Sequence, residues 1–183
     1  MGADGAADVL RRRASARIAL TLLYEGCGRL AAISLILIGV FVLAQVLGRL
    51  AGVPLPGTDD LAGYAMASSA FLGLAHTFNR GAHVRVTLLL DQVRPARQRY
   101  LEIVALAIGT VTAGFFLWYA VDLTIESAMM KEVSTGLLKI PTALPQGFMS
   151  IGVAALFIAL LDSLQMVLRG MIPPYALNRG DEV

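Results

Sequence analysis

The segment FLGLAHTFNRGAHVRVTLLLDQV, residues 71–93, shows how this chain is organised. An apolar stretch ends at a group of Arg and His residues, and apolar residues then resume at once. Of the 183 residues, 57% are hydrophobic and only 15% are charged, whereas about a quarter of an ordinary soluble domain is charged. A particle of this size cannot bury so much apolar surface, so the sequence indicates one domain that is integral to a membrane.

Four segments are long and apolar enough to cross a bilayer, which takes about 20 mostly apolar residues in a helix. The predicted spans are residues 30–50, 61–78, 101–123 and 144–168. The second is the least apolar, because it is built largely of Ala, Ser and Gly. The sequence therefore predicts an all-α membrane protein with four transmembrane helices.

The basic residues are distributed unevenly about these spans. On one side lie twelve of the fifteen, namely Arg11, Arg12, Arg13, Arg17, Arg29, Arg80, Arg85, Arg94, Arg97, Arg99, Arg169 and Arg179. The other side receives only Arg49, Lys131 and Lys139. Because cytoplasmic connections carry an excess of Lys and Arg, we expect residues 1–29 and 169–183 to lie in the cytoplasm.

Two further helices are expected at the cytoplasmic surface of the membrane. Residues 9–28 read as a basic amphipathic helix that lies on the surface. Residues 84–93 are too few to cross, and their alternating Val and Leu residues alone would suggest a strand. An open strand edge cannot lie in lipid because its backbone groups would be unpaired, so a short interfacial helix is preferred.

The second predicted span carries small residues at every fourth position, at Ala65, Ser69, Gly73 and Thr77. Such spacing allows the backbone of another helix to approach closely. This stripe is our candidate for a surface that meets a partner protein, and packing within the four helices is the alternative.

The sequence offers no set of residues for catalysis. The two histidines, His76 and His83, lie near the end of a span and in a connection, whereas a membrane haem protein needs His ligands on facing helices. No phosphate-binding Gly loop, metal-ligand cluster or nucleophile–base set is present. We therefore expect no enzyme, no cofactor and no metal site, and the net charge of +2 is too small to suggest nucleic acid. A small four-helix membrane redox protein is kept as an alternative.

Three stretches of the sequence together resemble a known family. They are VLGRLAGVPLPGTDDLAGY at residues 46–64, FLGLAHTFNRGAHVRV at 71–86 and STGLLKIPTALPQGFMSIG at 134–152. In order, and at these distances, they resemble the small membrane subunit of tripartite ATP-independent periplasmic (TRAP) transporters. The small subunit of a tripartite tricarboxylate transporter is the alternative within the same class.

The resemblance implies a function and a set of partners. The chain is expected to be a non-catalytic subunit in the bacterial inner membrane that supports a large elevator-type subunit. It would also help a periplasmic binding protein to dock, for sodium-driven uptake of an organic acid. The expected contacts with the large subunit are Ala65, Ser69, Gly73, His83 and Arg85. Arg49, Asp59 and Asp60 are expected to contact the binding protein or to pair with one another, although helix capping would also explain the two carboxylates.

Overall fold

The computed structural model describes residues 3–80 and 95–171, which form four helices and no β-strand. The helices are α1 (Ala3–Leu50), α2 (Thr58–Asn79), α4 (Pro95–Met129) and α5 (Ala143–Leu168). The all-α class is therefore confirmed for the described residues. The predicted interfacial helix at residues 84–93 and the tail beyond residue 171 lie outside them.

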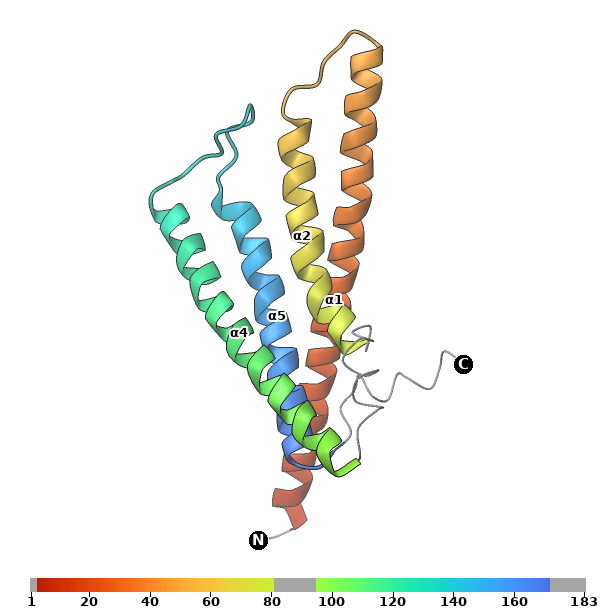
Figure 1. The fold of residues 1–183 in the computed structure, drawn as a ribbon, viewed down its shortest axis with the longest axis vertical. Helices are drawn as coiled ribbons and strands as arrows, with labels where there is room; N and C mark the ends of the chain where they lie inside the picture. The colour runs from red at the N-terminus through yellow and green to blue at the C-terminus, as the bar shows by residue number, and fades with distance from the viewer. Residues whose placement is uncertain (1–2, 81–94, 172–183) are drawn as a thin grey trace.

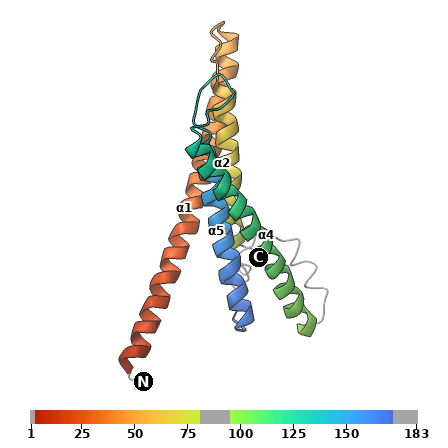
Figure 2. The same ribbon diagram turned by 90° about the vertical axis from the view of Figure 1, so that its left-hand side faces the viewer.

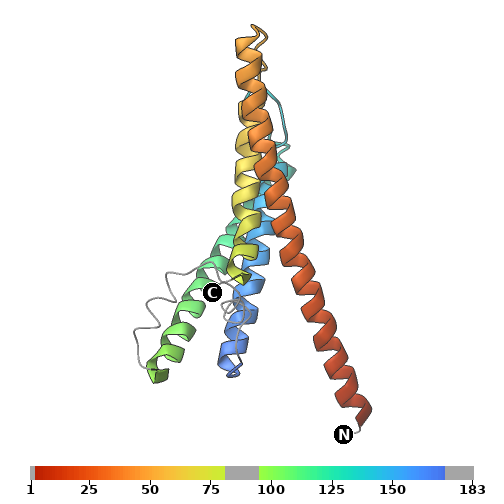
Figure 3. The ribbon, with the colours of Figure 1, turned by 90° about the vertical axis from the view of Figure 1, so that its right-hand side faces the viewer.

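The helices lie side by side in the order α1, α2, α5 and α4 (Figure 1). Helix α2 packs against α1 and α5, and α4 packs against α5. The connections 51–57 and 130–142 lie at the same end of the molecule, which we call the loop end. Towards the opposite end, α1 diverges on one side of α5 and α4 on the other (Figures 2 and 3). The result is an open layer of helices in which α1 and α4 form the two edges.

Helix α1 corrects one prediction, because it is continuous from Ala3 to Leu50 and contains no separate surface helix at residues 9–28. No Pro interrupts this segment, and Arg29 bonds Glu25 at 3.2 Å across the predicted boundary. Tyr24 and Cys27 before that boundary and Ala31 after it are buried in one cluster. A helical stripe that packs without interruption leaves no reason for a break at residue 29.

Three of the helices are long and apolar enough to span a membrane: Arg17–Leu50 within α1, Gln98–Met129 within α4, and Ala143–Leu168, which is α5. Helix α2 is not among them, in keeping with its Ala-, Ser- and Gly-rich composition. Four spans thus stay a prediction. At about 1.5 Å per residue the 48 residues of α1 extend for about 72 Å, more than twice the thickness of a hydrocarbon core.

Helices α1 and α5 end in the same way, at a glycine in the left-handed conformation. After α1, Gly52 has φ 74° and the Val53 amide donates to the Gly48 carbonyl at 2.9 Å. After α5, Gly170 has φ 74° and supports the same arrangement of bonds. Glycine is required here because other residues adopt positive φ only with strain.

Candidate interaction surfaces

The predicted small-residue stripe on α2 lies against α1 of the same chain. The Ser69 hydroxyl donates to the Ala31 carbonyl at 3.1 Å. A Cβ atom on Gly73 would lie 3.8 Å from the Cβ of Ala31, and Ala65 is buried. Packing within the chain accounts for the small size of these residues, and the contacts do not test an interface with a second protein.

One turn further along α2, His76 packs on a glycine of α1 that sequence reasoning did not single out. A Cβ atom at Gly28 would lie 2.6 Å from Nδ1 of His76, so only glycine leaves room for the imidazole. Nδ1 itself lies 3.3 Å from the Tyr24 carbonyl oxygen. His76 is therefore a contact between two helices.

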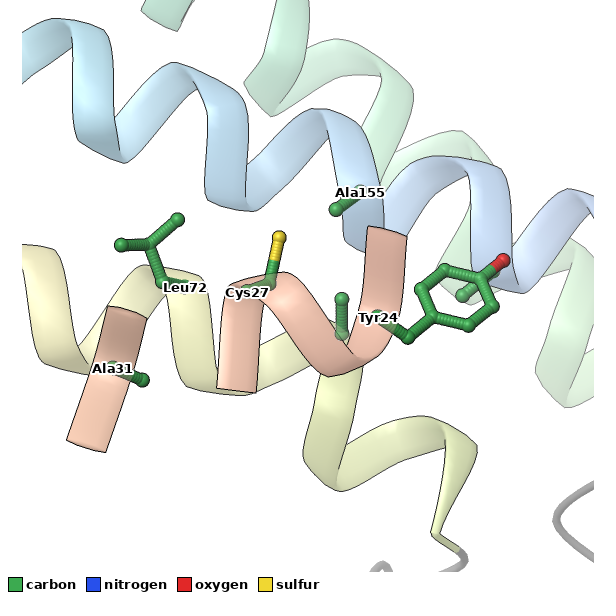
Figure 4. Packing of buried hydrophobic residues seen from close by; sticks show 7 residues of the cluster. Tyr24, Cys27, Ala31, Leu72 and Ala155 are labelled. Atoms are coloured by element: carbon green, nitrogen blue, oxygen red, sulfur yellow. The ribbon is translucent and has the colours of Figure 1, made fainter. Parts of the chain in front are cut away.

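The centre of the layer is a cluster of buried side chains where α1, α2 and α5 meet (Figure 4). Its members are Tyr24, Cys27, Ala31, Leu72, Ala75, Ala155 and Ala159. Beside it α2 and α5 approach so closely that a Cβ atom on Gly152 would overlap the Phe71 carbonyl group. Cys27, the sole cysteine of the chain, is only 3% exposed in this cluster.

One side of α2 stays uncovered by the described helices. Gly63, Met66 and Ala70 are exposed, and Met66 is 66% exposed. They follow one another at helical spacing, so they form a single strip, which we call the open face of α2. Most of it consists of residues with little or no side chain.

The two edge helices expose apolar side chains of different kinds. The large exposed apolar residues of α1 are aliphatic and include Leu30, Ile33, Ile36, Leu43 and Leu47. Those of α4 include the aromatic residues Phe115, Phe116, Trp118 and Tyr119. Apolar surface on this scale has to be covered by lipid or by protein.

At the loop end, Arg49 belongs to the last turn of α1 and the two carboxylates to the first turn of α2. Arg49 and Asp59 are exposed, and among the described residues no ion pair joins Arg49 to Asp59 or to Asp60. Asp60 points instead at the α4–α5 connection, where a Cβ atom on Gly136 would overlap its carboxylate. The structure thus brings Asp60 into contact with a segment that the sequence did not connect to it.

The α4–α5 connection at residues 130–142 is an ordered hairpin. Val133 and Pro141 form an isolated β-bridge, and the Ser134 amide donates to the Ile140 carbonyl at 2.8 Å. The hairpin is anchored on α2, because Leu138 occupies the space in front of Gly57, which itself has φ 84°. Its tip leaves Leu137 77% exposed.

Of three arginines at the end opposite the loop end, one bonds to the end of α5 and two are exposed. Arg99 of α4 donates from Nη2 to the carbonyl oxygens of Val167 and Leu168, at 3.2 and 3.3 Å. Arg80 and Arg169 are exposed. The predicted contacts His83 and Arg85 lie outside the described residues. Within residues 3–80 and 95–171, no three His, Cys, Asp or Glu residues come together as a metal site would require.

Comparison with known proteins gives one match. Residues 38–170, well over half of the chain, match the sequence model of the family described as tripartite ATP-independent periplasmic transporters, DctQ component. The matched region begins within α1 and ends just after α5. No curated protein and no solved structure matches the chain.

Proposed function

Since the chain belongs to the DctQ family, the small membrane component of TRAP transporters, we propose that it is a non-catalytic scaffold. It would support the large elevator-type subunit and help a periplasmic binding protein to dock, for sodium-driven uptake of an organic acid. The observation that carries the proposal is the family match, which extends from within α1 to the end of α5.

We propose that all four helices span the inner membrane, with both termini in the cytoplasm. Helix α2 is the least apolar, but it lies beside α1 and α5, which are both candidate spans. This position supports a course for α2 through the bilayer beside the two spans. Arg80 and Arg169 follow α2 and α5, and Arg99 lies near the start of α4, so all three lie opposite the loop end. This excess of basic residues supports a cytoplasmic position for that end.

The proposed contact with the large subunit lies on α2. Ala65, Ser69 and Gly73 were predicted for it, and since Ser69 and Gly73 also pack on α1, we extend the surface to the open face of α2. Small residues there would let a helix of the large subunit approach closely. His83 and Arg85 would extend the contact at the cytoplasmic end.

The proposed docking surface for the binding protein is the loop end. Arg49 and Asp59 are exposed there, beside the hairpin that Leu138 and Asp60 fix to α2. A pre-ordered surface binds a partner with little loss of conformational freedom, which favours docking.

Purification of the tagged chain from its own membranes tests the proposed role. We expect a second, larger multi-span membrane protein to purify with it, because a scaffold is stable in complex with the subunit it supports. Recovery of the chain with no other membrane protein would contradict the scaffold role. Accumulation of solute by vesicles that contain this chain alone would contradict it as well.

A matched pair of substitutions tests the position of the contact. Ala70→Leu adds bulk to the open face of α2, and Ala105→Leu makes the same change on the exposed side of α4. We expect Ala70→Leu alone to reduce the amount of large subunit recovered with the tagged chain. Loss with Ala105→Leu alone would move the contact to α4, and no loss with either would rule out the open face.

A further inference from the structure

A polar group of α1 is buried in the cluster where α1 meets α5. Tyr24 is only 5% exposed, and its hydroxyl is buried without a hydrogen bond to any described residue. A buried hydroxyl that leaves its donor unused is unfavourable, so a partner within reach is expected. The unbonded Tyr24 hydroxyl is not part of the proposed interfaces, and the packing of the cluster does not explain it.

Asp162 of α5 is the acidic residue that faces Tyr24. Ala155, Ala159 and Asp162 follow one another at helical spacing, and the two alanines belong to the same cluster as Tyr24. Helices α1 and α5 run in opposite directions, as Figure 1 shows. Figure 4 shows the Tyr24 ring on the side of Ala155 away from Cys27 and Ala31, and because the helices are antiparallel this is the side on which α5 continues to Asp162.

The charge of Asp162 acts on two groups of α1. It interacts electrostatically with the Tyr24 phenol and with the guanidinium of Arg17, which lies two turns before Tyr24 on the same face of α1. The structure records no hydrogen bond between Asp162 and a described residue. A donor without an acceptor and a carboxylate without a donor therefore lie on facing helices.

We propose that Tyr24 and Asp162 form a latch between α1 and α5, in which the Tyr24 hydroxyl donates to the Asp162 carboxylate and Arg17 pairs with the same carboxylate. The latch closes by rotation of the two side chains about their χ angles. It rests on the packing of the chain and is independent of the proposed transporter role.

The latch would control how α1 is attached to the rest of the molecule. Hydrogen-bonding contacts that join α1 to α2 among the described residues include those from Ser69 to the Ala31 carbonyl and between His76 and the Tyr24 carbonyl. Between Arg17 and Tyr24, the Thr21 hydroxyl bonds within α1, to the Arg17 carbonyl. A closed latch holds this part of α1 on α5, and an open latch frees it to separate from the layer.

Cys27 is a built-in reporter of this opening. It lies one turn from Tyr24 in the same cluster, faces α5 as Figure 4 shows, and is the only cysteine of the chain. Its reaction with N-ethylmaleimide requires α1 to move away from α5, so the labelling rate of the full-length chain in membrane vesicles measures how often the latch opens.

We expect Tyr24→Phe to raise the labelling rate about tenfold, the size expected for losing a hydrogen bond to a charged group. Asp162→Asn should also raise it, because the neutral amide cannot pair with Arg17 and accepts only a weaker hydrogen bond from Tyr24. The double variant should raise the rate by less than the product of the two single effects, because both changes act on the same contact. Matched controls are Tyr119→Phe and Asp122→Asn on the exposed side of α4, which should label at the original rate.

Unchanged labelling in Tyr24→Phe and Asp162→Asn, or rates that multiply in the double variant, would overturn the latch. Arg17→Gln keeps the test valid if the buried variants fold poorly, because Arg17 is exposed. We expect a smaller increase for Arg17→Gln, and an unchanged rate in that variant would exclude Arg17 from the latch. Circular dichroism of each purified variant identifies a change in labelling that comes from loss of helix.

Discussion

At the scale of single residues, this fold depends on glycines that allow helices to touch. Gly28 makes room for the His76 ring, Gly136 for the Asp60 carboxylate and Gly152 for the Phe71 carbonyl group. The last contact is the most demanding, because backbone atoms of α2 cannot move aside as a flexible side chain can. In a membrane, where water does not drive helices together, such close contacts supply much of the packing energy.

Gly152→Ala is therefore expected to destabilise the protein. The added methyl group would overlap the Phe71 carbonyl and lie 2.8 Å from the Leu72 nitrogen, so α2 and α5 would have to separate. We expect a loss of roughly 1–3 kcal/mol in the free energy of unfolding, the usual cost of overpacking. Thermal unfolding in detergent measures it.

Gly147→Ala is the control on the same helix, because a Cβ atom at Gly147 meets nothing within 4 Å. It should leave stability unchanged or raise it slightly, since Ala favours a helix over Gly. Equal stability of the two variants would show that the contact at Gly152 is not tight.

At the scale of elements, the end of α5 is held from outside the helix. Gly170, directly after α5, ends the helix with a left-handed turn. Arg99 of α4 adds two hydrogen bonds to the last carbonyl groups of α5. A guanidinium at a helix C-terminus also interacts favourably with the helix dipole. The packing of α4 against α5 is thus fixed at this end by a polar contact, while apolar residues such as Leu106 and Leu160 fix it further along.

Arg99→Ala should loosen the last turn of α5. We expect the amides at the end of α5 to exchange hydrogen about tenfold faster, because the carbonyl groups of Val167 and Leu168 lose a charged donor. Hydrogen exchange followed by mass spectrometry measures the change.

Arg169→Ala is the matched control for Arg99→Ala. The backbone amide of Arg169, which any residue but Pro retains, makes its bonds to the helix. If both substitutions changed exchange equally, the side chain of Arg99 would have no special part in the cap.

At the scale of the whole molecule, the helix pair α1–α2 packs against the helix pair α4–α5. α2 meets α5 closely at Gly152, and the connection 130–142 rests on the start of α2 through Leu138 and Gly136. The basic residues lie mainly at the opposite end, so the joined connections form the less basic surface. The positive-inside rule therefore predicts an extracytoplasmic position for this surface.

Labelling of single cysteines tests that orientation. With Cys27→Ser as background, we expect Leu137→Cys to react with a membrane-impermeant maleimide added outside intact spheroplasts, because Leu137 is exposed at the hairpin tip. Arg169→Cys should react only after the membrane is permeabilised. The reverse pattern would place both termini outside the cytoplasm.

Much of the fold could be predicted from the sequence. The predicted spans 61–78 and 144–168 agree with α2 and α5 to within a few residues. The third prediction, 101–123, is shorter than α4, because hydropathy falls at charged residues such as Arg99 and Glu126 while the helix continues beyond them. The separate helix at residues 9–28 was wrong, because α1 continues without a break to Leu50 and Arg29 bonds Glu25 along it.

The candidate surfaces were harder to predict. The stripe at Ala65, Ser69 and Gly73 was recognised as a place of close approach, but its spacing does not say which helix approaches. The contact of Asp60 with Gly136 had no signal in the sequence, because Asp60 belongs to α2 and Gly136 to a connection far along the chain.

The sequence by itself determined the membrane class, the positions of the helices and the uneven distribution of charge. These follow from local composition and from the length of apolar segments, which each stretch of chain carries on its own. Only the tertiary structure decided the order α1, α2, α5 and α4, the covered and open sides of α2, and the meeting of Tyr24 with α5. Those features depend on how close two distant backbones can come and at what register, and this is fixed by the fit of side chains across the interface.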